Sequence, residues 1–438
     1  MPAARNLLRT LRRLPALLIL SLLLLFLLQR STLPLGQVWT AAAIAVREHQ
    51  FDYVGWELGA LGAKLGAALF GAHPFMDEAA RAGYVRAYLA DVARAQALDA
   101  QISAAYSDPG VPDPQAATAA PRAERDALRA DLSARQTLAE SILEGQVSAV
   151  LAEQGFGLGG QVFPPVNMRF TQVPNLLIVS PRDEIRFDVS INLDPLPVEQ
   201  AAALEAEIEA ARDVSALIVP LGGVALYPAM ILETPSIPWA VDVFAHEWLH
   251  HYLFGFPLGL AYFSGEGFAG ETRTINETTA SVFGGELGRL VLARYYPDLL
   301  PPEPAAPDPD APPPPPPAFD FGAELDRTRR RVDELLAAGE VEAAEAYMEE
   351  RRQEFHASGY PIRRLNQAYF AFYGGYQAGS GGTPGAGGDD PIGPAVEALR
   401  AASPSLRDWV LTMRGITTRD GLLAARAALA GETVLQLR

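Results

Sequence analysis

The residues whose types and spacing point most clearly to chemistry lie in the segment Ala245-His246-Glu247-Trp248-Leu249-His250-His251. This segment contains the pattern H-E-x-x-H. Residues four positions apart share one face of a helix, so the imidazoles of His246 and His250 can bind one metal ion. Zinc lowers the pKa of a water bound to it towards about 7, and the adjacent Glu247 can take the proton from that water. The spacing therefore predicts hydrolysis at a zinc site, with Glu247 as general base and later proton donor.

The scarcity of histidine makes this cluster informative. The chain has 438 residues and six histidines, and three of the six lie within six consecutive residues. The helix predicted for residues 239–254 is apolar nearly all round, and buried His and Glu side chains without a partner would be costly. The alternative is a helix with coincidental polar residues, and the apolar surroundings favour the metal site.

A tetrahedral zinc site needs a third protein ligand and one open position. The residue six positions after His250 is Phe256, so a third histidine at the metzincin spacing is excluded. Glu277 is a candidate because it lies at the start of a helix predicted for residues 276–296, where Ala280 would let a second helix approach closely. The other carboxylates that follow the zinc helix are Glu266, Glu271 and Glu286.

With these residues, segment 236–285 resembles the gluzincin metallopeptidases, the group that contains thermolysin-like enzymes and the zinc aminopeptidases. The resemblance implies a Zn²⁺ ion held by His246, His250 and Glu277, because the third ligand in that group is a glutamate of a second helix, commonly in N-E-x-x-A or N-E-x-x-S. It also implies that the strand before the zinc helix, predicted for residues 224–232, pairs with the backbone of a peptide substrate. An ordinary core strand is the alternative for these residues.

Two features depart from the gluzincin pattern. The gap of 27 residues from His250 to Glu277 is longer than is common in the group, and Ser281 stands where thermolysin-like enzymes have an aspartate. The acid that orients a histidine ligand must then come from elsewhere, and Asp242 lies one turn before His246. Glu266 and Glu271 stay open as alternative third ligands. The residues that could support an oxyanion by a phenol or an imidazole are His356, Tyr360, Tyr369, Tyr373 and Tyr376.

Composition excludes several other functions. The chain has no cysteine, which rules out disulfides, a thiol nucleophile and an iron–sulfur cluster. Its net charge of −17 makes it a poor binder of nucleic acid, because that affinity depends on basic residues that neutralise phosphates. Lys64 is the one lysine among 35 basic residues, which indicates a GC-rich and therefore bacterial source.

The N-terminus has the pattern of an export signal. Four arginines precede an uncharged, Leu-rich run at residues 14–28. No small-x-small cleavage site follows this run, so an uncleaved anchor is favoured over a cleaved signal peptide. The positive-inside rule then predicts a single-pass membrane protein with a cytoplasmic N-terminus and with residues 31–438 outside. A second apolar stretch, residues 51–70, contains charged residues and is predicted as a buried or interfacial helix.

The remaining pattern predicts a mostly helical α+β fold, with a small antiparallel sheet before a two-helix zinc site. Gly222-Gly223 is predicted as the hairpin turn between strands 216–221 and 224–232. The Gly-rich segment 374–393 lacks the placement of a phosphate-binding loop. We predict five segments: residues 1–30 as tip and anchor, 31–160 as a helical region, 161–300 as the catalytic core, 301–318 as a Pro-rich linker, and 319–438 as a second helical region.

The sequence therefore favours a membrane-anchored zinc metallopeptidase that acts on a peptide or protein substrate outside the cytoplasm. Two alternatives remain at this stage. The first is an intramembrane zinc protease, because residues 239–263 are quite apolar. The second is a non-catalytic, membrane-anchored scaffold that binds a protein partner, although such a scaffold would not need Glu247.

Overall fold

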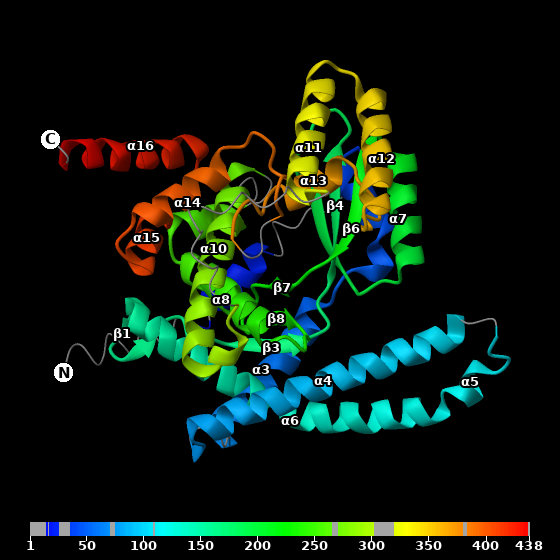
Figure 1. The fold of residues 1–438 in the computed structure, drawn as a ribbon, viewed down its shortest axis with the longest axis vertical. Helices are drawn as coiled ribbons and strands as arrows, with labels where there is room; N and C mark the ends of the chain where they lie inside the picture. The colour runs from blue at the N-terminus through cyan, green and yellow to red at the C-terminus, as the bar shows by residue number, and fades with distance from the viewer. Residues whose placement is uncertain are drawn as a thin grey trace, which may run out of the picture.

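The computed structural model of this chain describes residues 15, 17–25, 36–70, 75–107, 110–264, 270–301, 319–379 and 383–436. Most of these residues are helical, and short strands form two three-stranded sheets and one two-stranded ribbon. The predicted mostly helical α+β fold is confirmed. Figure 1 shows α8 and α10 near the middle of the molecule, with α11 and α12 standing on one side and the long pair α4 and α6 on the other.

The first three-stranded sheet is antiparallel and has the order β5-β4-β6. Its central strand reads as an unbroken apolar run because both of its faces are covered: Leu176 and Ile178 join one core cluster, and Leu177 and Val179 join another. The strands are β4 (Asn175–Pro181), β5 (Val189–Leu193) and β6 (Val214–Pro220). The helices that cover the two faces are α2 (Val38–Ala45) and α7 (Val198–Ala211) on one side, and α11 (Phe321–Ala337), α12 (Val341–Ala357) and α13 (Gln367–Tyr373) on the other.

The second sheet has the order β3-β8-β7 and corrects the predicted hairpin. Its strands are β3 (Met168–Thr171), β7 (Gly223–Val224) and β8 (Ala229–Leu232). Gly222-Gly223 does not form a hairpin turn, since the strands before and after it lie in different sheets and the turn of the β7-β8 hairpin lies at residues 225–228. The pair β3-β8 is parallel, so the sheets are not purely antiparallel. Both edges of β8 are occupied, which leaves β7 as the edge strand on its side of the sheet.

The largest core cluster holds α8 (Ile237–Leu253) and α10 (Glu271–Tyr295) between two groups of helices. Ser236 caps α8, because its Oγ accepts a hydrogen bond from the backbone N–H of Trp239, and Pro238 occupies the first turn, as predicted. The other helices of this cluster are α4 (Glu78–Ser107), α6 (Ala119–Leu151), α14 (Ile392–Ala402), α15 (Leu406–Met413) and α16 (Arg419–Gln436). Short α5 (Pro114–Ala117) lies in the turn between α4 and α6.

The prediction of a single-pass membrane protein is wrong. Within the described residues, none of the helices combines the length and the apolar character that crossing a bilayer requires. Helix α3 (Tyr53–Phe70) carries Glu57 and Lys64.

Lys64 joins α3 to α6 through a buried charge cluster. Its ammonium lies 2.8 Å from Glu140 Oε2 and 2.7 Å from Glu144 Oε1, and both carboxylates also accept backbone N–H groups of β3. Two carboxylates share one ammonium, so their charges are not balanced. Burial raises the pKa of Glu144 from 4.5 to about 7, although Lys64 opposes this shift.

Replacing Glu144 by Gln is expected to flatten the dependence of stability on pH. The folded-state pKa of Glu144 lies above its unfolded value, so its contribution is fully present below pH 4.5 and is lost as the pH rises through about 7. Across this window the wild-type free energy of unfolding should fall, relative to Glu144→Gln, by up to about 3 kcal/mol. Urea denaturation at a series of pH values measures this difference. The exposed Glu48→Gln variant is the control, and an identical pH slope in wild type and Glu144→Gln would contradict the expectation.

Candidate metal centre

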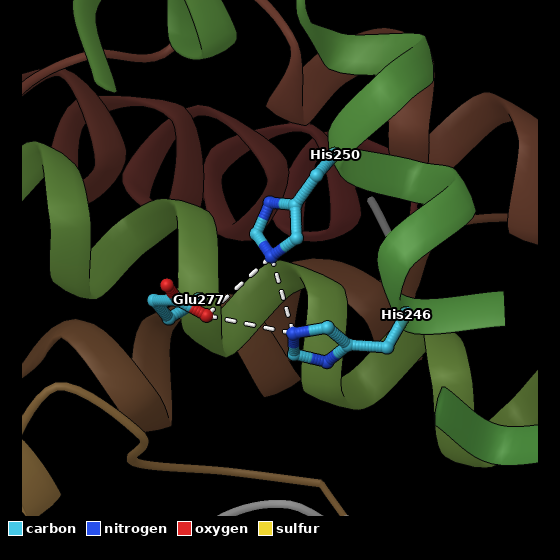
Figure 2. A group of neighbouring side chains, drawn as sticks. All are labelled: His246, His250 and Glu277. Carbon is cyan, nitrogen blue, oxygen red and sulfur yellow. Dashed lines mark hydrogen bonds and ion pairs between the residues drawn. The ribbon is translucent and has the colours of Figure 1, made fainter. Parts of the chain in front are cut away.

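Two helices bring three metal-binding side chains together. His246 and His250 lie one turn apart on α8, and their Nε2 atoms are 3.1 Å apart. Glu277 comes from α10, and its Oε2 lies 3.5 Å from each of these nitrogens. Figure 2 shows all three side chains converging on one point. Among the described residues this is the one group of three or more such side chains with ligand atoms within 4.8 Å of one another.

The donor set fits a metal ion. Two imidazole nitrogens that face each other at this distance each direct a lone pair or a proton at the other, and a cation between them would satisfy both. His250 is 3% exposed and Glu277 4%, so water can do little to solvate them. Burial opposes the ionisation of Glu277, but His250, His246 and Arg273 outweigh it and hold the pKa of this carboxyl well below its usual range. Glu277 is therefore an ionised ligand.

Tyr262 orients Glu277, and sequence reasoning missed it. Its hydroxyl donates a hydrogen bond of 2.6 Å to Glu277 Oε1, which leaves Oε2 directed at the histidines. Its ring also stacks on the ring of His250, with the centroids 5.6 Å apart. Tyr262 lies on α9 (Pro257–Phe263), which is inserted between the two site helices. The unusually long gap between His250 and Glu277 was the signal in the sequence, because it leaves room for this helix.

Glu247 lies beside the three ligands and forms no ion pair with either histidine. The residue is 5% exposed, and none of the hydrogen bonds between described residues reaches its carboxylate. Burial raises the pKa of Glu247, while His246 and His250 lower it in part. The backbone of β7 closes the other side, since a Cβ added to Gly223 would overlap the Glu247 carboxylate. Sequence reasoning treated Gly223 as a turn residue and missed this contact.

His251, the third histidine of the cluster, has a structural role. Its Nε2 lies 2.5 Å from the carbonyl oxygen of Leu226, so this nitrogen must carry the proton and donate. Burial lowers the pKa of His251 to about 4, which keeps the ring neutral. The contact fixes the β7-β8 turn to α8 and thereby holds β7 against Glu247.

Glycines on α10 set the distance between the two site helices. A Cβ added to Gly284 would lie 2.6 Å from Asp242 Oδ1 and 3.1 Å from His246 Cβ, and one added to Gly288 would lie 3.2 Å from Asp242 Cα. The sequence pointed to Ala280 for this close approach, and the tight positions lie one and two turns later. Asp242 was predicted to orient a histidine. Its charge helps to raise the pKa of His246, together with Glu277 and Glu247 and against the effect of burial.

The other candidates lie apart from the three ligands or outside the described residues. Glu266 falls in the segment 265–269, outside the described residues. Glu271 is the first residue of α10, and the carboxylate of Glu286 pairs with Arg400 at 2.6 Å. His356 is exposed on α12, and the ring of Tyr360 packs on Phe319 and Phe321.

The three tyrosines at helical spacing, Tyr369, Tyr373 and Tyr376, have different surroundings. Two of them pack in a core, and the third lies next to the site. Tyr369 and Tyr373 contact each other, with ring centroids 4.5 Å apart, and border the core beside the antiparallel sheet. Burial raises the pKa of Tyr376, and the charges of Glu277 and Glu247 raise it further, so this phenol stays protonated next to the site.

Comparison of the chain with protein-family models, with curated proteins and with solved structures gave no match. The argument for function therefore rests on the geometry of the site.

Removing one of the three ligands should abolish metal binding. We expect the purified protein to hold one tightly bound zinc per chain and His250→Ala to hold almost none, because two protein ligands do not retain zinc. Elemental analysis after dialysis measures this content. His356→Ala, which removes an exposed histidine of α12, should keep its zinc. A wild-type protein that binds no zinc when zinc is supplied would contradict the assignment.

Adding a methyl group at the helix crossing should disturb both stability and metal binding. Gly284→Ala must push α8 from α10, and overpacking of this kind costs about 1–3 kcal/mol. We expect a lower melting temperature and weaker zinc binding, measured by thermal denaturation and competition with a chelator. Gly145→Ala on α6 is the matched control, because no atom lies within 4 Å of its added Cβ. Equal behaviour of the two variants would contradict the role given to Gly284.

Proposed function

We propose that this protein is a zinc-dependent hydrolase of peptide bonds. The observation that carries the proposal is the position of Glu247, a buried residue that accepts no hydrogen bond from the described part of the chain, beside a His-His-Glu ligand set. A site that only held a metal would not need a second buried acid that is not a ligand. Two imidazoles and one carboxylate match the ligands of catalytic zinc sites, which keep one position open. The gluzincin resemblance of residues 236–285 supports the same activity.

Each residue then has a defined task. A zinc ion held by His246, His250 and Glu277 would act as a Lewis acid that polarises the scissile carbonyl and acidifies water. Glu247 accepts the proton of the attacking water and passes it to the leaving amine. Its raised pKa suits this exchange, because a base works best when its pKa approaches the operating pH. Tyr262 holds Glu277 in its orientation.

The edge strand β7 is the proposed guide for the substrate backbone. The strand predicted for this task, residues 224–232, divides into β7 and β8, and β8 lies between β3 and β7. No described strand pairs with the other edge of β7, and Gly223 places β7 directly against Glu247. A peptide that adds to β7 as a further strand would bring its carbonyl groups past the base. Tyr376, which keeps its proton, is the proposed donor to the oxyanion.

Glu247→Gln is expected to abolish peptide cleavage while zinc stays bound. Glutamine keeps the shape of the side chain but cannot accept the proton, and loss of a general base costs about 10²–10⁴-fold in rate. Cleavage of a peptide library, followed by mass spectrometry, measures activity, and elemental analysis measures zinc. Glu271→Gln, at the start of the same helix as Glu277, should retain both. Cleavage that persists in Glu247→Gln would refute the mechanism, and a protein that binds zinc but cleaves nothing would favour the scaffold.

A further inference from the structure

Arg273 is a buried cation for which the proposed mechanism has no use. It lies in the first turn of α10, one turn before Glu277, and is 3% exposed. Aromatic rings cover its guanidinium: its Cζ lies 4.3 Å from the ring centroid of Phe187, 5.2 Å from that of Tyr376 and 5.6 Å from that of Phe372. Gly375 allows the group to sit there, since a Cβ at this position would overlap a terminal nitrogen of Arg273.

The N–H groups of Arg273 have no acceptor among the described residues. No hydrogen bond or ion pair joins its guanidinium to any of them, and its Nε is buried without a partner. Aromatic rings interact with the faces of a guanidinium, whereas all five of its N–H groups point outward in the plane. The rings therefore hold the group in place and leave its hydrogen-bonding edge unused. Arg351, which is also buried, behaves differently, because it donates to Thr328 and pairs with Glu324.

Burying a cation is costly, and among the described residues no acid forms an ion pair with Arg273. The carboxylate that interacts most clearly with Arg273 is Glu277, which is already committed to the two histidines and to Tyr262. The start of α10 adds the positive end of a helix dipole to the same region. Side chains of a helix lean towards its N-terminus, so the guanidinium lies beyond Glu277 in that direction. This combination is a binding site for a carboxylate, which matches the planar fork of arginine.

We propose that Arg273 binds the C-terminal carboxylate of the substrate, so that the enzyme removes residues from the C-terminus of peptides. This inference rests on the proposed peptidase function. One helical turn separates Arg273 from Glu277 and corresponds to a rise of about 6 Å, whereas an extended peptide advances about 3.5 Å per residue. The bond at the metal centre would then lie one or two residues before the terminal carboxylate. Side-chain carboxylates have the same chemistry, and the experiment separates them from the terminal one.

Direct binding to the metal-free protein tests the inference without any need for catalysis. The probes, measured by titration calorimetry, are N-acetyl-L-phenylalanine, its amide, and the α-amide of N-acetyl-L-glutamate, which carries only a side-chain carboxylate. Since a hydrogen bond to a charged group is worth about 1.5–3 kcal/mol, we expect the terminal acid to bind about tenfold tighter than either amide. Equal binding of the acid and its amide would overturn the proposal, as would preference for the side-chain acid.

Variants of Arg273 then locate the binding. Arg273→Met should abolish the preference for the acid, and Arg273→Lys, which keeps the charge but not the fork, should retain part of it. Arg289→Met removes an exposed arginine from the same helix and should behave as wild type. If Arg273 only pins α13 to α10, Arg273→Met will lower the melting temperature but leave the wild-type ratio of acid to amide intact. Should Arg273→Met fail to fold, the wild-type ratio and Arg273→Lys still decide the question.

Peptide cleavage separates this inference from the proposed function. The expected result is that wild type cleaves peptides with a free C-terminus at least tenfold faster, in kcat/KM, than the same peptides with a C-terminal amide. Cleavage of the acid and amide peptides at the same rate would be consistent with the proposed peptidase function but would overturn the role of Arg273. Selective binding of the acid without cleavage of any peptide would retain a carboxylate site at Arg273 and refute the peptidase.

Discussion

The close crossing of α8 and α10 is the constraint on which the rest of the site depends. Two ligands come from one helix and the third from the other, so the metal centre exists only while the helices stay close together. Gly284 and Gly288 provide this distance, because they let Asp242 and His246 approach the backbone of α10. Two neighbouring elements contact the helices at this crossing. Tyr262 of α9 donates to Glu277, and Gly223 of β7 packs against Glu247.

The chain places charges in its interior in two different ways. Lys64 is surrounded by two carboxylates and joins α3 to α6, so its charge is fully used in holding the fold. Arg273 is enclosed by aromatic rings and has no acid of its own among the described residues. A buried cation that is paired with acids joins elements of the fold, whereas one that leaves donors unused is available for a ligand. This contrast within one molecule is the physical basis for treating Arg273 as functional.

The sequence predicted what depends on local chemistry and missed what depends on distant contacts. His246 and His250 follow from helix periodicity, and the Ser236 cap follows from the preference of helix starts. Tyr262 and Gly223 could not be inferred, because each acts on a residue well separated from it in the chain, Glu277 and Glu247 respectively. The same reason explains the misplaced hairpin: a Gly-Gly pair favours a turn locally, but the partner of β6 is β4 and not β8. The Leu-rich N-terminus was overinterpreted from composition alone.

The helix that supplies Glu277 is completed by residues from the other end of the chain. Backbone atoms of the segment after α13 lie directly on α10: the backbone N–H of Gln377 donates to Thr278 Oγ1, and Gly379, at a φ of +81°, lies so close to Ser281 that a Cβ would be 2.5 Å from its carbonyl carbon. A ribosome must therefore release about a hundred further residues after Glu277 before this face of the helix is covered. During synthesis α10 therefore stays uncovered on this face until the segment after α13 has been made, so the order of translation delays completion of the surroundings of Glu277.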